Sequence, residues 1–413
     1  MSVLTKNQIT NLVKELEQDT DNKIVVLFGA GEIGKEAVSF LLENGIEIVC
    51  IADNNSNIWN SKINGIDIVS PDKLKTLNPY IVIISNNFYI EIARQLDEMD
   101  INNYISFFMF KGIYKSKPFE NPEASSVERA LSWILNNQQD NGGVSVYRGC
   151  KFEYPEVTGY IIPTMLQYGF KEEALRMCDF LNSVINEDGS FNAAGSERKY
   201  LFDTAQALRG LNAIQKVSSK YYGIQCRTAN YLFSVLKNNE GIFPKSYEDD
   251  TIIPETIMLF ALPPMLDFAK LNNDEEKIQM VHNAVKKYLT SPDVISQKTL
   301  THFLAYQIDG LIDLGYRDEV KEIIDKLLLS QREDGSIPAF DGVNWVCITG
   351  CSQIAICLYK LGKYEPANRI MKWVDSNLEE NGGFFGSVGE NAEYLPDREL
   401  SWAVKFYLDA YKL

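Results

Sequence analysis

The sequence predicts two units of different fold classes: an α/β unit with a parallel sheet, followed by an all-α (α/α)6 toroid, which is a closed ring of six helix pairs. Three observations support this prediction. Short runs of β-forming residues alternate with helical stretches up to about residue 115. From residue 125 to 413 the hydrophobic residues follow a helical period. This helical part also repeats with a period near 47 residues, and repeats of that length build rings or solenoids.

The composition argues against several classes of function. The chain has 413 residues, 40 basic and 56 acidic, and its net charge of −16 without a basic cluster disfavours a nucleic-acid partner. No apolar stretch is long enough to span a bilayer, and the first residues lack a secretory signal, so we expect a cytoplasmic protein. Seven scattered cysteines and two histidines predict free thiols and no metal site.

A glycine-rich turn follows the first expected strand, 24–28. The turn reads Gly29-Ala30-Gly31-Glu32-Ile33-Gly34, a helix continues to about residue 44, and a second strand, 47–52, ends in Asp53. Strand, GxGxxG, helix, strand and acidic residue form the dinucleotide-binding fingerprint. With further strands expected at 66–69, 80–85 and 104–108, the pattern predicts a Rossmann-like fold over residues 1–115.

This fingerprint predicts that NAD or a nucleotide sugar binds as the cofactor or ligand of the first unit. The predicted cofactor-binding residues are Gly29, Gly31, Glu32, Ile33, Gly34, Asp53 and Ser85. Asp53 would accept hydrogen bonds from the ribose hydroxyls, which favours NAD over NADP. The alternative is structural, because a tight turn from strand to helix uses glycines without any ligand.

A linker is expected at 116–124, where Pro118 and Pro122 occur, and the toroid is expected at 125–413. Five times in the toroid a helix ends in polar residues, a glycine and a small or apolar residue. The copies are QQDNGGV, NEDGSF, NNEGIF, QREDGSI and NLEENGGF, marked by Gly143, Gly189, Gly241, Gly335 and Gly383. The steps between these glycines are 46, 52, 94 and 48, and 94 is twice 47, so a sixth copy has been lost near 291–298.

Two sets of helices alternate along this repeat. The first set is amphipathic and the second is apolar nearly all round, which predicts an outer ring around a buried inner ring. The outer helices are expected at about 127–138, 172–185, 227–238, 276–291, 318–332 and 364–378, and the inner helices at about 155–168, 201–217, 254–271, 298–314, 346–361 and 397–412. Because most loops from outer to inner helices are long, the first turns of the inner helices are expected to face a ligand-binding mouth.

The first turns of the inner helices carry the residues that could act in catalysis. The catalytic candidates are Glu156, Asp203, Glu255, His302 and Glu399. Carboxyl groups that share a buried mouth raise each other's pKa, so one can hold a proton while another is ionised. Glu156 and Asp203 are the first candidates. The alternative is that these acids only complement helix amino termini and that His302 is a core residue.

Aromatic residues flank these positions, and aromatic faces suit sugar rings. The predicted substrate-binding residues are Tyr154, Tyr160, Arg198, Tyr200, Trp345, Tyr394, Arg398 and Trp402. The two arginines could hold a carboxylate or phosphate, or could only neutralise Asp203 and Glu399.

Two segments resemble known families. The segments VVLFGAGEIGKEAVSFLLENGIEIVCIADNN and INGIDIVSPDKL resemble the small Rossmann-like domain of bacterial surface-polysaccharide enzymes, which implies binding of a nucleotide sugar or dinucleotide. The segments YPEVTGYIIPT and FDTAQALRGL resemble toroid proteins encoded among polysaccharide genes. Their superfamily includes sugar epimerases, unsaturated glucuronyl hydrolases, lyases, terpene cyclases and prenyltransferases. The DxDD motif of one class of terpene cyclases and the prenyltransferase zinc set are absent.

These observations lead to a hypothesis of a cytoplasmic enzyme of surface-polysaccharide or glycan biosynthesis that acts on a sugar or nucleotide sugar. Carboxylate acid/base chemistry of the epimerase or isomerase type is expected in the toroid mouth. The alternatives are a non-catalytic glycan or nucleotide-sugar binding protein, a glycoside hydrolase or lyase, and a terpene-cyclase-like enzyme. An acidic mouth disfavours the last of these.

Overall fold

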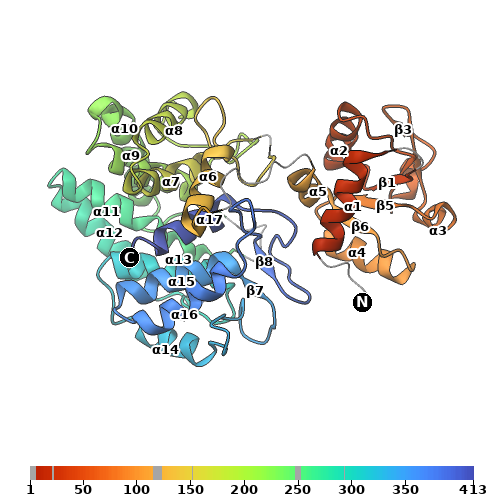
Figure 1. The fold of residues 1–413 in the computed structure, drawn as a ribbon. Helices are drawn as coiled ribbons and strands as arrows, with labels where there is room; N and C mark the ends of the chain where they lie inside the picture. The colour runs from red at the N-terminus through yellow and green to blue at the C-terminus, as the bar shows by residue number, and fades with distance from the viewer. Residues whose placement is uncertain (1–5, 21–22, 115–122, 151, 247–252, 293) are drawn as a thin grey trace. The chain divides into compact units, whose positions relative to one another are not determined.

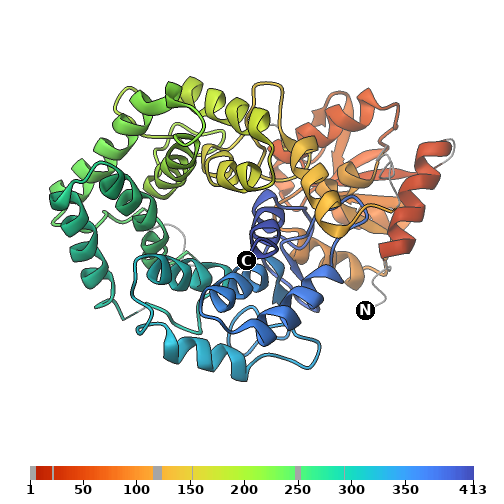
Figure 2. The same cartoon turned by 60° about the vertical axis from the view of Figure 1, so that its left-hand side comes forward.

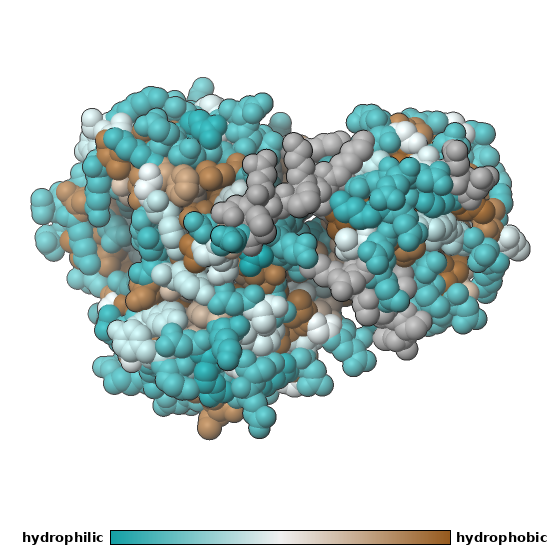
Figure 3. Space-filling model, in the orientation of Figure 1, coloured by the Kyte–Doolittle hydropathy of each residue, from teal (hydrophilic) through white to brown (hydrophobic). Residues whose placement is uncertain are grey.

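The computed structural model describes residues 6–20, 23–114, 123–150, 152–246, 253–292 and 294–413. The chain forms two compact units, Met1–Pro118 and Phe119–Leu413. None of the helices in the described ranges combines the length and apolar character that crossing a membrane requires. On the face shown in Figure 3, hydrophobic residues lie scattered among hydrophilic ones.

The N-terminal unit contains a six-stranded sheet in the order β3-β4-β2-β1-β5-β6 (Figure 1). The strands are β1 (Val25–Phe28), β2 (Cys50–Ala52), β3 (Lys62–Ile63), β4 (Ile66–Val69), β5 (Ile81–Ile84) and β6 (Tyr104–Ser106). The helices are α1 (Lys6–Gln18), α2 (Glu32–Glu43), α3 (Leu74–Leu77), α4 (Tyr89–Glu98) and α5 (Phe107–Ile113), with short 3-10 turns η1 (Ser56–Ile58) and η2 (Pro71–Lys73).

Each face of this sheet is covered by its own core. Side chains alternate along a strand, so Val25 and Leu27 of β1 face one way while Val26 and Phe28 face the other. The first face packs against residues of α1, α2 and α5, and the second against residues of α3 and α4. Burial on both sides explains why the central strands β1, β2 and β5 consist of uninterrupted hydrophobic residues.

The predicted parallel sheet, and with it the Rossmann-like fold class, is wrong. β4, β2, β1, β5 and β6 are parallel, but β3 runs antiparallel to β4, so the sheet is mixed. The physical reason is the turn at Asn64-Gly65, where both residues have positive φ, 50° and 85°. This pair makes a tight hairpin that folds the chain back onto the sheet edge. The sequence predicted the strand at 66–69 but not the two-residue strand before it.

The C-terminal unit is built of outer and inner helices. The outer helices are α6 (Ser126–Asn137), α8 (Lys171–Val184), α10 (Tyr222–Asn238), α12 (Glu275–Tyr288), α14 (Lys321–Leu329) and α16 (Tyr364–Asp375). The inner positions are occupied by α7 (Pro155–Gln167), α9 (Leu201–Ile214), η4 (Glu255–Phe260) with α11 (Leu262–Leu271), α13 (Thr301–Asp313), α15 (Ile348–Lys360) and α17 (Ser401–Ala410). Shorter elements are η3 (Ser219–Tyr221), β7 (Val346–Cys347) and β8 (Ser387–Val388).

The inner helices form a closed ring, as Figure 2 shows. Each contacts the next in chain order, and the last, α17, packs against the first, α7. The toroid part of the expected fold is therefore seen, whereas the sheet part needed correction. The third inner position differs from the expected single helix 254–271. A 3-10 turn replaces its beginning, because Pro263 and Pro264 lack the N–H groups that an α-helix interior needs and instead lie in the first turn of α11.

The repeated glycines have a structural role. Gly189 has a φ of 93°, and a β-carbon there would lie 2.4 Å from the carbonyl oxygen of Arg227 in the next outer helix. The same close approach joins Gly335 to Arg369, and Gly382 to Arg129 at the point where the ring closes. In the copies with two glycines, the first one, Gly142 or Gly382, has the positive φ and approaches the neighbouring backbone. The second, which the sequence marked, lies against side chains instead.

Side chains of the repeat add to this connection. The Gln138 amide donates to the carbonyl oxygens of Gly142, at 3.0 Å, and Glu173 in the next outer helix, at 3.1 Å. The hydroxyl oxygen of Thr158 in α7 accepts a hydrogen bond from the backbone N–H of Val144 at 2.9 Å. In these copies the repeat motif therefore joins an outer helix to its neighbour and to the inner helix that follows, whereas Gly241 makes no comparable approach.

Candidate functional site

The helices α7 and α9 lie in unusually close contact. A β-carbon on Gly159 would lie 2.6 Å from the carbonyl oxygen of Gln206, and one on Gly210 would lie 2.4 Å from the carbonyl oxygen of Gly159. Only glycine allows the two backbones to approach this closely. Glu156 and Asp203 both lie in the first turns of these helices, so the close packing brings the two carboxyl groups together at one end of the ring.

The two carboxyl groups affect each other's ionisation. Burial and then the neighbouring Asp203 raise the pKa of Glu156 well above its ordinary value, although a hydrogen bond with Tyr154 favours its charged form. Burial raises the pKa of Asp203 to about 7, again opposed by a hydrogen bond with Tyr154. Asp203 is only 2% exposed, whereas Glu156 is partly exposed. The pair can therefore hold a single proton near neutral pH, which is the state that acid/base catalysis requires.

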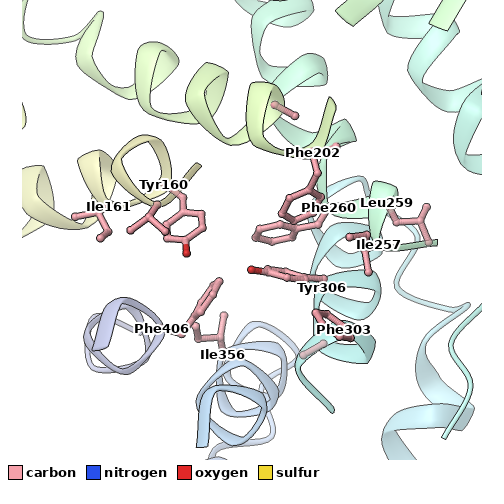
Figure 4. Packing of buried hydrophobic residues seen from close by; sticks show 14 of the residues in the cluster. Tyr160, Ile161, Phe202, Ile257, Leu259, Phe260, Phe303, Tyr306, Ile356 and Phe406 are labelled. Atoms are coloured by element: carbon pink, nitrogen blue, oxygen red, sulfur yellow. The ribbon is translucent and has the colours of Figure 1, made fainter. Parts of the chain in front are cut away.

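Aromatic rings surround this pair. The His302 ring centroid lies 4.6 Å from that of Tyr306 and 5.6 Å from that of Tyr394, and it stacks almost parallel to Trp402 at 6.5 Å. Burial and then the nearby Glu156, Tyr306, Tyr394 and Asp203 raise the pKa of Tyr160 well above its ordinary value. In Figure 4 the hydroxyl groups of Tyr160 and Tyr306 point into the space between the labelled rings. We call this region the chamber, and its residues include Glu156, Asp203, Tyr160, His302, Tyr306, Tyr394 and Trp402.

His302 is held as a neutral ring. Its Nδ1 lies 2.6 Å from Oε1 of Gln353, and burial lowers its pKa to about 4. Because an amide oxygen only accepts, Nδ1–H is the donor and Nε2 is left as an acceptor. A neutral imidazole with so low a pKa accepts a proton poorly at neutral pH. His302 is therefore better suited to hydrogen bonding with a ligand than to the base role that the sequence predicted.

Several polar atoms at the chamber lack a hydrogen-bond partner among the described residues. They are Oδ2 of Asp203, the hydroxyl of Tyr160 and Nε2 of Gln353, and all three side chains are at most 2% exposed. Buried polar groups normally find partners, since leaving one unpaired costs about 1–3 kcal/mol. Three such atoms beside one pair of carboxyl groups are the arrangement expected where a polar ligand binds.

Glu255 and Glu399 bond to other groups in the part of the chain that the structure describes. Glu255 accepts a hydrogen bond from the backbone N–H of Ser246 at 2.8 Å. Glu399 accepts one from the indole N–H of Trp133 at 2.6 Å and two from Asn381 at 3.0 and 3.1 Å. Both carboxylates therefore bond to loops or neighbouring helices, which is a different structural role from the helix-terminus alternative, and their catalytic role stays a prediction.

The predicted substrate-binding residues also form two groups, those that lie at the chamber and those that contact other parts of the protein. Tyr154, Tyr160, Tyr394 and Trp402 lie around the chamber, as the preceding contacts show. Arg198 instead donates to the carbonyl oxygen of Ser246 and stacks on Tyr200 at 5.0 Å. Arg398 pairs with Asp397 at 3.1 Å and lies over the ring of Tyr147. Trp345 is buried and packs edge-on against Phe340.

Sequence reasoning missed four chamber residues, namely Phe260, Tyr306, Gln353 and Phe406. A signal for two of them was present, because Tyr306 follows His302 by four positions and Phe406 follows Trp402 by four. Residues four apart share a helix face, so each lies one turn deeper in the ring. The same spacing connects Glu156 to Tyr160.

In the N-terminal unit the predicted cofactor residues have structural partners. Asp53 accepts hydrogen bonds from the backbone N–H groups of Ala30, at 2.7 Å, and Asn55, at 2.8 Å. The Ser85 hydroxyl donates to the carbonyl oxygen of Gly29 at 2.8 Å, and a β-carbon on Gly34 would lie 2.1 Å from the same oxygen. These contacts satisfy the turn without a ligand.

The remaining residues of the glycine-rich turn have different surroundings. Glu32 pairs with Lys35 on the surface, and Ile33 packs against the core of the first sheet face. Gly31 has no neighbouring atom where a β-carbon would lie, so the space beside it is open. Binding of NAD or a nucleotide sugar at this turn stays a prediction.

A cavity of about 810 Å³ lies elsewhere in the C-terminal unit. Its lining residues come from the carboxyl-terminal halves of the inner helices, whereas Glu156 and Asp203 lie at their amino-terminal ends. Phe260 and Phe406 line this cavity and also contact Tyr306 of the chamber. The rings of Phe260 and Phe406 therefore connect the residues of the chamber with the lining of the cavity.

Comparison with known proteins supports the fold of each unit to a different extent. Residues 21–105 match the family described as C2185-like, N-terminal. No curated protein matches the sequence. Among solved structures, an alpha-amylase from Clostridium perfringens aligns at 13% identity and a TM-score of 0.53, covering 70% of this chain and 96% of the other.

Two further solved structures have the same helical fold. An unsaturated glucuronyl hydrolase from Bacillus sp. GL1 aligns at 16% identity and a TM-score of 0.52, covering 69% of this chain and 94% of the other. A glycosidase solved in complex with glucose aligns at 10% identity and a TM-score of 0.55, covering 70% of this chain and 95% of the other. At these identities the likeness concerns the fold.

Proposed function

We propose that the C-terminal unit is a carbohydrate-active enzyme that cleaves a glycosidic bond, with Glu156 and Asp203 as its acid/base pair. The observation that carries this proposal is the pair itself. Two carboxyl groups from adjacent inner helices share a buried environment that raises the pKa of both. Maintaining this arrangement costs stability, because charged groups lose their hydration in it, and such groups are concentrated at functional sites.

The proposed reaction is a hydrolysis. Glu156, whose pKa is raised by burial and by the neighbouring Asp203, donates its proton to the glycosidic oxygen as the bond between this oxygen and the anomeric carbon breaks. Asp203, in its ionised form, accepts a proton from the water whose oxygen attacks the anomeric carbon. One bond to carbon breaks and one forms, and the pair regains its original state when a proton returns from Asp203 to Glu156.

The chamber wall supports a sugar as the substrate. Sugar rings present C–H faces that pack on aromatic rings and hydroxyl groups that pair with polar atoms. Tyr394 and Trp402 are partly exposed at the chamber and offer such faces. The unpaired atoms of Asp203, Tyr160 and Gln353 offer the hydrogen bonds. The neutral Nε2 of His302 adds an acceptor.

Bond cleavage is favoured here over the isomerisation expected from the sequence. The solved structures that share the fold are named as an alpha-amylase, a glycosidase and unsaturated glucuronyl hydrolases. The expectation of isomerase chemistry came from the role proposed for the N-terminal unit in binding a nucleotide, and no contact in the chamber requires it. A non-catalytic binder would not need two carboxyl groups with raised pKa values.

The test is turnover of a substrate panel by the full chain. The panel contains aryl α- and β-glycosides, malto-oligosaccharides and unsaturated glucuronyl disaccharides, with products resolved by chromatography and mass spectrometry. We expect cleavage of at least one class and a loss of about 100-fold or more in kcat for Asp203→Asn and Glu156→Gln, as removal of an acid/base group produces. The matched control is Glu187→Gln, an exposed residue in a repeat loop, which should retain wild-type rates.

Two outcomes would contradict the proposal. Wild-type rates in both chamber variants would remove the pair from catalysis. Binding of a glycan without any product, detected by calorimetry over the same panel, would instead establish a binding protein.

A further inference from the structure

The cavity at the carboxyl-terminal ends of the inner helices has a charge balance opposite to that of the chain. Six basic side chains line it, and the acidic ones number four: Asp267, Asp309, Asp313 and Asp409. The basic residues are Arg209, Lys216, Lys270, Lys360, Lys405 and Lys412. Over the whole sequence, acidic residues outnumber basic ones by 56 to 40. A local excess of cations in so acidic a chain points to a negatively charged ligand.

Part of this positive charge is neutralised within the protein. Lys360 pairs with Asp309 at 2.7 Å and with Asp313 at 2.6 Å, and Lys405 pairs with Asp409 at 2.7 Å. Arg209 donates to the amide oxygen of Gln206 and to the carbonyl oxygen of Phe260, both at 2.9 Å. Among the described residues it forms no ion pair with a carboxylate. Arg209 is thus fixed in place by neutral oxygen atoms, although its charge also acts on the nearby Asp313 carboxyl, where it opposes the rise in pKa that burial causes.

Helix dipoles account for some of these cations, such as Lys270 in the last turn of α11, but not for Arg209 and Lys405. The carboxyl end of a helix favours a positive charge, but this effect is confined to the last turn. Lys360 is the last residue of α15 and fits that explanation. Arg209 lies five residues before the end of α9, and Lys405 lies five before the end of α17, so both are too deep for it. Lys405 is moreover only 4% exposed.

Arg209 and Lys405 also lie close enough to repel each other. Burial lowers the pKa of Lys405 even though it is paired with Asp409, and Arg209 acts in the same direction. Two cations held near each other at the wall of a cavity are stabilised when an anion binds between them. Aromatic rings lie beside both cations. Arg209 lies 4.3 Å from the ring centroid of Phe260, and Lys405 lies 3.7 Å from that of Phe406, so apolar contact with a ligand is available next to each charge.

We propose that this cavity is a second ligand site, which takes a small organic anion with its phosphate or carboxylate group at Arg209 and Lys405. The planar guanidinium group matches the geometry of both oxyanions. A volume of about 810 Å³ is far larger than an inorganic ion needs and is in the range of sites for ligands of metabolite size. The rings of Phe260 and Phe406 then pack against the body of the ligand.

Calorimetric titration of the full chain tests this site. The probes are glucose 6-phosphate, glucuronate, inorganic phosphate and glucose. The first two compare a phosphate with a carboxylate on a sugar, inorganic phosphate tests the anion without a sugar, and glucose tests the sugar without a charge. We expect at least one of the two sugar anions to bind about tenfold or more tightly than glucose and than phosphate. Arg209→Gln and Lys405→Met should each weaken that binding by about tenfold, the size expected for loss of a charge-assisted contact.

Matched variants separate this site from the chamber. Lys237→Gln removes one exposed positive charge from α10, outside the cavity, and should leave binding unchanged. Asp203→Asn should also leave it unchanged, so this proposal can hold even if no substrate is cleaved in the chamber. If Arg209→Gln does not fold, as judged by circular dichroism, Lys405→Met decides the outcome. The proposal is overturned if neither sugar anion binds more tightly than glucose, or if folded variants of the two cations bind as the wild type does.

Discussion

The carbonyl oxygen of Arg227 lies 2.4 Å from the point where a β-carbon on Gly189 would stand. An outer helix thus approaches the preceding repeat so closely that the repeat must carry glycine at this point. The same relation at Gly142, Gly335 and Gly382 explains the glycine in four of the five copies, whereas Gly241 has a positive φ of 76° without the close approach.

Gly189→Ala is expected to destabilise the C-terminal unit by about 2–4 kcal/mol, because it combines a positive φ with a backbone clash. The control is Gly315→Ala, which has a φ of 90° but no neighbouring atom within 4 Å. That substitution carries only the conformational cost, about 1 kcal/mol. Denaturant unfolding monitored by circular dichroism measures both, and equal effects would show that the close approach is unimportant.

Gly159→Ala is expected to reduce both stability and turnover. A β-carbon at this position meets the backbone of Ala207 and Gln206 in α9, so the two helices must separate. We expect a loss of about 2–4 kcal/mol in the free energy of unfolding, as for other overpacked or strained sites. Separation would also move Glu156 away from Asp203, so kcat should fall in the fraction of protein that remains folded.

The control for this variant lies in a helix without such a contact. Gly223→Ala in α10 adds a β-carbon where no atom lies within 4 Å. Alanine has the higher helix propensity, so stability should rise by up to about 1 kcal/mol. A Gly159→Ala variant that is as stable and as active as the wild type would show that the α7–α9 contact does not position the carboxyl pair.

Asp203→Asn is expected to make the protein more stable at neutral and alkaline pH while abolishing activity. The pKa of Asp203 is raised in the folded state to about 7, so the folded state holds its proton more tightly than the unfolded chain. Wild-type stability contributed by this group is therefore present at low pH and is lost as the pH rises toward 7.

Asparagine does not ionise, so the stability gained by the variant should grow between about pH 4 and pH 7 and stay constant above. We expect a gain of about 1–3 kcal/mol at pH 8. Denaturant unfolding at several pH values measures it, with Glu187→Gln as a surface reference. A variant that loses stability as the pH rises would show that Asp203 is stabilised as a carboxylate.

The pH dependence of kcat/KM should be bell-shaped. Activity should rise as the pair loses its first proton, near the pKa of about 7 for Asp203, and fall at higher pH as Glu156 loses the second. The residual activity of Glu156→Gln should lack the alkaline limb. Rates measured from pH 4 to pH 10 on one cleaved substrate provide the check, and an optimum well below pH 6 would contradict this assignment of the two protons.

The sequence predicted those features of the structure that depend on residues close together in the chain. Hydrophobic periodicity and the glycine repeat were sufficient to predict the ring, because each pair of helices forms its own repeat. Glu156 and Asp203 could be aligned by the same period. Their neighbours in the chamber could be found in part, since Tyr306 and Phe406 follow predicted residues by one helical turn.

Other features depend on contacts that a sequence does not display. Glu399 is bound by Trp133, which lies 266 positions away and joins the ring only when it closes. Glu255 is bound by a backbone N–H in a loop, and backbone donors leave no mark on the sequence. The edge strand β3 has two residues, one of them a lysine, so it is too short for an alternating pattern.

The contact of Gly382 with Arg129 has a consequence for biosynthesis. The first outer helix, α6, contacts α17 only after almost the entire chain has been synthesised. Until then, the apolar surface of the earliest helices stays exposed to solvent. Nascent fragments of this unit should therefore depend on chaperones more than an open, linear array of the same helices would.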